Sequence, residues 1–139
     1  MTRLALILSL ALIAPLTPAI ADESFLDAMR DYMDFATPLE GIILPGQIDE
    51  TVFQAATFID ARSAEEHATG TIPGARNIER REVLTRIDEV PDSGLVVMFC
   101  NTGVRSTQAM FALRVAGRSN VVVMQSGLDG WLETAPYHP

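Results

Sequence analysis

The chain has 139 residues, of which 10 are basic, all of them arginine, and 18 are acidic, so its formal net charge at pH 7 is −8. This acidic balance argues against nucleic acid as a partner, because phosphate backbones bind basic surfaces. The length suits one compact domain and is too short for two. With Cys100 as its only cysteine, the chain cannot form an internal disulfide.

Residues 1–21 have the composition of a secretory signal peptide. Arg3 provides the positive start, Leu4–Leu16 is an apolar run, and Ala19-Ile20-Ala21 forms a small-residue cleavage pattern. We therefore expect cleavage after Ala21, a periplasmic or secreted location, and a mature net charge of 9 − 18 = −9. The apolar run of about 13 residues is short for a bilayer. No stable membrane anchor is expected, and an uncleaved anchor is the alternative.

Residues 22–47 are predicted to form an N-terminal helical extension, whose role the sequence leaves undetermined. Over 22–35, apolar and acidic residues alternate at helical spacing, which indicates an amphipathic helix. The glycine- and proline-containing stretch 41–46 is predicted to be a break and connector. A short helix capped by Asp49 is predicted over 48–54.

The next part of the chain is predicted to contain one strand and two helices. The apolar run 57–60 ends in a carboxylate and predicts a buried strand. Ser63 and Glu66 form a Ser-x-x-Glu capping box, which predicts a helix from Ser63 to Gly70. Residues 80–90 are also predicted to be helical, because turn residues stop the pattern directly after them.

Two apolar strands, 95–99 and 120–124, flank a helix that is predicted over 106–116. Strand, helix and strand in this order indicate a parallel sheet with helices on both faces, so the predicted fold class is α/β. A short terminal helix is expected to pack Trp131 on the core. Ligands bind beyond the carboxyl ends of the strands in such sheets, and Cys100 lies at one of these ends.

Cys100 opens a short loop, Cys-Asn-Thr-Gly-Val-Arg-Ser, between a predicted strand and a predicted helix. This geometry turns backbone N–H groups and the positive end of the helix dipole toward one point. A thiolate at that point is stabilised, and Arg105 adds a positive charge beside it. The alternative is that Cys100 is a small buried hydrophobic residue without a chemical role.

Other polar candidates have structural interpretations. Asp60 and Arg62 flank a strand end and are expected to form a buried ion pair or loop brace. His67 and His138 have no partner at metal-ligand spacing, so both are expected to be solvated. No metal and no cofactor is predicted.

Three segments together resemble the rhodanese (sulfurtransferase) family. Residues 58–63 (Phe-Ile-Asp-Ala-Arg-Ser), 66–67 (Glu-His) and 70–78 (Gly-Thr-Ile-Pro-Gly-Ala-Arg-Asn-Ile) together resemble its first signature. Residues 97–106 resemble its active-site loop, and Gly-Leu-Asp-Gly-Trp at 127–131 resembles its closing signature. The resemblance covers roughly residues 49–133.

The resemblance implies a single rhodanese-like domain, which we place at 48–135, with a tail at 136–139. The Cys-Asn-x-Gly loop behind an export signal is most similar to the periplasmic, phage-shock-type single-domain rhodaneses. Thr71 departs from the family pattern, which usually has His there. We expect a local change in hydrogen bonding at Thr71 without loss of activity.

The resemblance further implies a two-step sulfur transfer. A small anionic donor such as thiosulfate converts the Cys100 thiolate into a persulfide, and cyanide or a thiol then removes the sulfur. A protein sulfur acceptor is a further partner class. Thiolate nucleophilicity and leaving-group quality set such exchanges. The loop N–H groups are expected to stabilise the persulfide as an oxyanion hole does for oxygen, and they belong to Asn101, Thr102, Gly103, Val104 and Arg105.

Arg105 bears on the choice between sulfur and phosphate chemistry. Cysteine phosphatases place Arg six positions after the Cys, whereas here Ser106 occupies the sixth position and Arg105 the fifth. The shorter loop favours sulfur. Arg105 has two open roles, which are to attract the anionic donor or to brace the loop through a carboxylate such as Asp60.

Two rivals to an enzyme remain at this point. A persulfide carrier would use the same loop but deliver sulfur only to a dedicated protein. An adaptor would dock a partner on the acidic N-terminal helix, with Cys100 vestigial. The intact loop argues against the adaptor.

Overall fold

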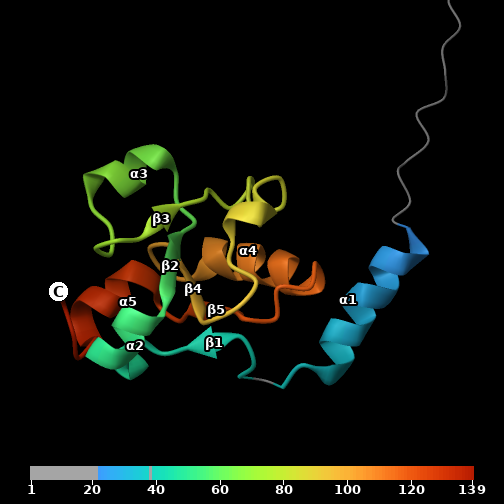
Figure 1. The fold of residues 1–139 in the computed structure, drawn as a ribbon, viewed down its shortest axis with the longest axis horizontal. Helices are drawn as coiled ribbons and strands as arrows, with labels where there is room; N and C mark the ends of the chain where they lie inside the picture. Colours follow the sequence, from blue (N-terminus) through green and yellow to red (C-terminus); the bar gives the residue numbers. More distant parts are fainter. Residues whose placement is uncertain (1–21, 38) are drawn as a thin grey trace, which may run out of the picture.

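The computed structural model describes residues 22–37 and 39–139 (Figure 1). The predicted signal peptide lies outside the described residues. The centre of the fold is a five-stranded sheet in the order β1-β5-β4-β2-β3, and every strand pair in it is parallel. The strands are β1 (Ile42–Ile43), β2 (Thr57–Asp60), β3 (Arg76–Asn77), β4 (Val96–Phe99) and β5 (Val121–Met124).

Short helices connect these strands. The α-helices are α1 (Glu23–Phe35), α2 (Glu50–Ala55), α3 (Ala64–Thr69), α4 (Val104–Val115) and α5 (Gly127–Thr134), and the 3-10 helices are η1 (Pro45–Gln47) and η2 (Ile87–Glu89). The predicted caps are present. The Asp49 side chain accepts a hydrogen bond from the N–H of Val52, and Ser63 and Glu66 form the reciprocal capping box of α3.

Both faces of the sheet are covered, which confirms the predicted α/β class. Side chains alternate along β4, so Met98 packs with α4 residues such as Leu113 on one face. Phe99 faces the other side, where α5 contributes Leu128 and the buried Trp131. Burial on both faces explains why β4 and β5 are uninterrupted apolar runs.

The prediction of a helix over 80–90 is wrong. Residues 80–86 form turns, and only η2 is helical. The N–H of Arg80 donates to the carbonyl of Ala61 at 3.1 Å, which ties the start of the segment to the end of β2. The prediction depended on the turn residues at 91–94, which can follow a series of turns as well as a helix. Ion pairs of Arg86 with Glu82 and Glu89 stabilise the turns here.

The predicted connector at 41–46 contains an edge strand. β1 pairs with β5 through hydrogen bonds from the N–H groups of Val123 and Gln125 to the carbonyls of Gly41 and Ile43, at 2.7 and 2.9 Å. The sheet therefore includes residues upstream of position 48. A strand of two residues is too short to show the period-two alternation on which the prediction depends.

The predicted N-terminal helix is present as α1, which projects from the side of the domain (Figure 1). It touches α4 through Tyr32, whose ring packs edge-on to Phe111 with centroids 5.3 Å apart. The guanidinium of Arg114 lies 5.6 Å from the centre of the Tyr32 ring. Within the described ranges, no helix has the length and apolar character needed to span a membrane.

Candidate active site

Cys100 follows the last residue of β4 at the carboxyl edge of the sheet. The parallel register places Phe99 beside Asp60, the last residue of β2, and the N–H of Ala61 donates to the Phe99 carbonyl at 2.8 Å. The chain segments that follow β2 and β4 therefore lie next to each other. This adjacency brings Arg62 and α3 to the loop that Cys100 opens.

The other side of the loop is held by backbone contacts with α5. The carbonyls of Cys100 and Asn101 accept hydrogen bonds from the N–H groups of Leu128 and Asp129, at 2.7 and 3.0 Å. Gly127 makes this approach possible, because a Cβ at that position would lie 2.2 Å from the Cys100 oxygen. With these carbonyls held by α5, the loop N–H groups are free to face the sulfur.

The Cys100 sulfur lies inside the loop, and the residue is only 1% exposed. The N–H of Gly103 donates to Sγ at 3.2 Å, and the hydroxyl of Ser106 lies 3.5 Å from Sγ. Gly103 caps the N-terminus of α4 with a φ of 95°, a conformation that favours glycine. Because so little of Cys100 is exposed, a sulfur donor must present a protruding terminal sulfur to reach it.

These contacts favour the thiolate. Burial raises the pKa of Cys100, but hydrogen bonds from the Ser106 hydroxyl and from the N–H groups of Ser106, Thr102 and Arg105 outweigh burial and lower the pKa below its usual value. The positive end of the helix dipole, at the N-terminus of α4, also stabilises the thiolate. The geometry therefore suits a nucleophilic sulfur better than an inert buried one.

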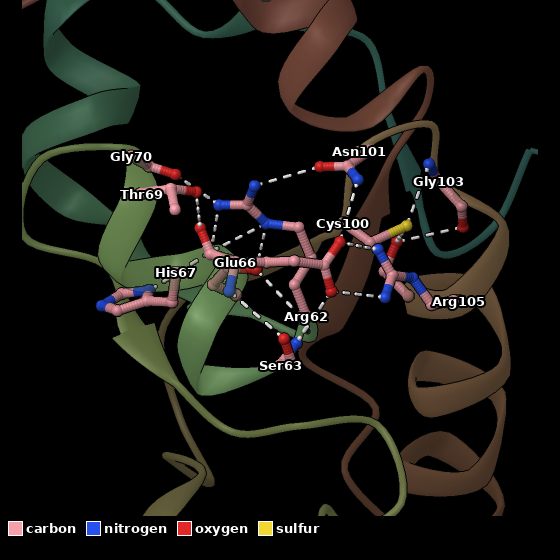
Figure 2. Close-up of polar contacts among 12 residues, drawn as sticks. Arg62, Ser63, Glu66, His67, Thr69, Gly70, Cys100, Asn101, Gly103 and Arg105 are labelled. Atoms are coloured by element: carbon pink, nitrogen blue, oxygen red, sulfur yellow. Dashed lines mark hydrogen bonds and ion pairs between the residues drawn. The ribbon is translucent and has the colours of Figure 1, made fainter.

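Arg105 pairs with a carboxylate, as one of its two open roles required, but the carboxylate is Glu66 and not Asp60. Its two terminal nitrogens lie 2.7 and 2.6 Å from the two carboxylate oxygens of Glu66 (Figure 2). Glu66 also accepts hydrogen bonds from the Asn101 amide and the Ser63 N–H, each at 3.2 Å. The Arg105 guanidinium, together with the Ser63 N–H, lowers the pKa of Glu66 to about 2.

The predicted buried pair of Asp60 and Arg62 is present and also braces the loop. Arg62 Nη2 lies 2.7 Å from Asp60 Oδ2, and Nη1 donates to the Asn101 side-chain oxygen at 3.0 Å. Burial raises the pKa of Asp60, but the hydrogen bonds from Arg62 and Thr71 together outweigh burial and lower the pKa below its usual value, so the carboxylate stays ionised. Arg62 thus links the end of β2 to the loop after β4.

The prediction that His67 is solvated is wrong. Its Nδ1 lies 3.2 Å from Asp60 Oδ2, and its side chain is only 26% exposed. Thr71, which stands where the family usually has His, donates a hydrogen bond from its hydroxyl to the same carboxylate at 2.8 Å. His138 is exposed, as expected, and packs edge-on to Trp131.

The residues predicted for the site lie around one loop, but in different roles. Thr102, Gly103 and Arg105 direct N–H groups at the sulfur, whereas Asn101 uses its side chain to join Arg62 to Glu66. The Val104 side chain is 67% exposed.

Sequence reasoning missed two residues of the site. Apart from the segments that resemble the family, the sequence singles out Ser106 only by its spacing and Glu66 only by its capping box, although that box already turns the Glu66 carboxylate toward the start of α3. No cluster of His, Cys, Asp or Glu suited to a metal ion occurs in the part of the chain that the structure describes.

Several known proteins resemble this chain. A sulfurtransferase of Allochromatium vinosum is 33% identical over 73 residues, which cover 52% of this chain and 68% of that protein. A putative sulfur carrier protein of Bacillus subtilis is 27% identical over 78 residues, which cover 56% of this chain and 42% of that protein. Other curated relatives are matched over as little as 32% of their length.

Solved structures share the fold. A rhodanese-related protein of Thermoplasma volcanium superposes with a TM-score of 0.60 at 25% identity, covering 66% of this chain and 89% of that one. A human single-domain sulfurtransferase superposes with a TM-score of 0.57 at 27% identity, covering 67% and 96%. Residues 45–134 match the model of the rhodanese-like domain. The chain therefore belongs to the rhodanese-like domain family.

Proposed function

We propose that the protein is an exported sulfurtransferase that carries sulfane sulfur on Cys100. The observation that supports this best is the position of the sulfur, 3.2 Å from the Gly103 N–H inside a loop whose N–H groups lower its pKa. The same donors would stabilise the negative charge of a terminal persulfide sulfur. The mechanism uses no cofactor.

In the first step, the Cys100 thiolate attacks the outer sulfur of a donor such as thiosulfate. A new S–S bond forms, the old S–S bond breaks, and sulfite leaves with the bonding electron pair. The total charge is −3 before and after, so no oxidant or reductant is required. Such exchanges are fastest with a thiolate nucleophile and a good leaving group.

In the second step, an acceptor such as cyanide or a thiol attacks the terminal sulfur of the persulfide. The S–S bond to Cys100 breaks, and the thiolate is regenerated with the electron pair. With cyanide the product is thiocyanate. Because the chain has a single cysteine, the acceptor must come from outside the protein.

The proposal includes export, because residues 1–21 combine a positive start, an apolar run and a small-residue cleavage pattern. It places the protein near the periplasmic, phage-shock-type single-domain rhodaneses. N-terminal sequencing of the protein from producing cells tests the location. A chain beginning at Asp22 supports export with cleavage, and a chain that retains Arg3 contradicts the cleavage and favours the uncleaved anchor.

Intact-mass measurement tests the chemistry most directly. After incubation with thiosulfate or an organic persulfide, the protein should gain the mass of one sulfur atom, and cyanide should remove it. The matched control is Cys100→Ser, which keeps the size of the side chain but loses the nucleophile and should gain nothing. Sulfur on Cys100→Ser, or no sulfur on the native protein from any donor, contradicts the proposal.

A persulfide carrier is the second candidate, since a putative sulfur carrier protein is among the relatives. Turnover separates the two functions. Repeated thiocyanate or thiol-persulfide production supports an enzyme. A persulfide that forms but resists small acceptors supports a carrier that delivers sulfur to a protein partner.

A further inference from the structure

The positive charges beside the loop are already neutralised. Arg62 is bound to the buried carboxylate of Asp60, with Nη2 2.7 Å from Oδ2. Arg105 is bound by both oxygens of Glu66, at 2.7 and 2.6 Å. Figure 2 shows Glu66 between Arg105 and Asn101, on the side of the loop that faces α3. The four charged side chains of this network therefore sum to zero.

Glu66 is held firmly in this position. Besides the two bonds from Arg105, its oxygens accept hydrogen bonds from Asn101 Nδ2 and the Ser63 N–H. Each of these donors belongs to a separate segment, namely the loop, α4 and the start of α3. The Glu66 and Arg105 side chains are each 35% exposed, so a donor that approaches the site meets both charges together.

This arrangement disfavours a dianion. Thiosulfate carries two negative charges, the nucleophile is an anion, and the protein as a whole has a net charge of −8. Because Cys100 is buried, the donor must also lose water near the sulfur, and that cost rises steeply with charge. The loop N–H groups and the N-terminus of α4 already stabilise the thiolate. A free guanidinium beside the loop would compensate for the second anion, but Arg105 is paired with Glu66.

We propose that Glu66 is a specificity-determining residue that neutralises Arg105, so that the site takes sulfur from donors with at most one negative charge, such as organic persulfides, in preference to dianions. This inference rests on the proposed sulfurtransferase function and narrows its donor class. In the transfer, the Cys100 thiolate attacks the outer sulfur of R–S–SH and forms a new S–S bond. The old S–S bond breaks, R–S⁻ leaves with the electron pair, and the proton stays on the transferred sulfur.

The test compares how fast two donors load Cys100. The probes are thiosulfate and the persulfide of 2-mercaptoethanol, and quenched intact-mass measurements give a second-order rate constant for each. In Glu66→Gln, which frees the charge of Arg105, the ratio of the thiosulfate constant to the persulfide constant should rise about tenfold or more. Glu65→Gln removes the same charge from an exposed neighbour in α3 and should change the ratio less than about twofold.

One control addresses folding. Glu66→Gln also weakens the cap of α3, and Ser63→Ala weakens that cap without changing any charge. Ser63→Ala should therefore leave the donor ratio unchanged.

The native protein provides a second test of the inference, which needs no variant. Its thiosulfate constant should rise with added salt, because salt screens repulsion between the dianion and the site.

A native thiosulfate constant that falls with salt overturns the inference, because it reports an attractive site. An unchanged or lower donor ratio in Glu66→Gln also overturns it and leaves Glu66 as a brace. Failure of the proposed function looks different, since no donor then adds sulfur to the native protein. If both donors load the native protein and the donor ratio is the same in Glu66→Gln, only the role of Glu66 is refuted.

Discussion

The loop of Cys100 is held on two sides by different kinds of contact. On the α5 side, N–H groups of Leu128 and Asp129 bind loop carbonyls, so the contact consists of backbone alone. On the side of β2 and α3, the contact consists of charged side chains, Asp60 with Arg62 and Glu66 with Arg105. Both sides hold the loop in place, and the second side also places charged groups beside it. A substitution on the α5 side can therefore change the shape of the loop without changing its charge.

The largest effect is expected from a substitution that disrupts the backbone hydrogen bonds between α5 and the loop. In Gly127→Ala, the new Cβ would lie 2.2 Å from the Cys100 oxygen, and the backbone there has a φ of +55°. Neither the loop carbonyl nor α5 can move away cheaply, so we expect a loss of about 4 kcal/mol in the free energy of unfolding. Sulfur loading should fall with it.

The matched control is Gly74→Ala, which has a φ of +78° but no atom within 4 Å of the added Cβ. It isolates backbone strain and should cost about 1–2 kcal/mol. Urea denaturation of both variants gives the comparison. Equal losses in the two variants would mean that the close approach of α5 to the loop contributes nothing.

The next largest effect on the free energy of unfolding is expected at the buried ion pair of Asp60 and Arg62. Asp60→Asn removes the charge that compensates Arg62, and both side chains are buried. We expect a loss of about 3 kcal/mol, because an unpaired buried guanidinium remains. The exposed Asp88→Asn serves as control and should stay within about 0.5 kcal/mol of the native protein. A neutral effect of Asp60→Asn would show that the pair is dispensable.

A smaller effect, on reactivity and not on folding, is expected at Ser106. Its hydroxyl helps to lower the pKa of Cys100, so Ser106→Ala should raise the pH midpoint of Cys100 alkylation. The native midpoint should lie below that of a free thiol. Thr107→Ala is the control, since the Thr107 hydroxyl bonds the Gly103 carbonyl at 2.8 Å and not the sulfur. A midpoint unmoved by Ser106→Ala would assign the low pKa to the backbone N–H groups alone.

The smallest effect is a pH dependence at Glu66, whose pKa in the folded protein is lowered to about 2 from 4.5. A lowered folded-state pKa stabilises the protein above the unfolded-state value, and this stabilisation is lost as the pH falls toward about 2. The stability difference between the native protein and Glu66→Gln should therefore shrink between about pH 4.5 and pH 2. A difference that is constant over this window would show that the Glu66 charge does not stabilise the fold.

Local signals in the sequence predicted the elements that build the site. The apolar runs at β2 and β4, the capping box at Ser63 and the loop after Phe99 all depend on neighbouring residues, and the structure contains each of them. The helix predicted over 80–90 failed because the turn residues after it can follow a series of turns as well as a helix. The strand β1 was missed because its pairing with β5 is a long-range contact.

The charge network could not be predicted for the same reason. Glu66 and Arg105 are 39 positions apart, and their pairing follows from the register of β2 against β4, which no local pattern reports. Arg105 does pair with a carboxylate, but with Glu66 and not with the Asp60 named as an example, because Arg62 already binds Asp60. Long-range partners of charged residues need the strand order before they can be assigned.

The contact between α5 and the loop also has a consequence for biogenesis. The N–H groups that fix the Cys100 and Asn101 carbonyls belong to Leu128 and Asp129, which the ribosome adds after the loop itself. Until α5 docks, these two carbonyls lack their hydrogen-bond donors, so we expect the loop to reach its final shape only after residue 129 is in place. The lowered pKa of Cys100, which depends on that shape, is therefore expected to require a part of the chain that is synthesised after the loop.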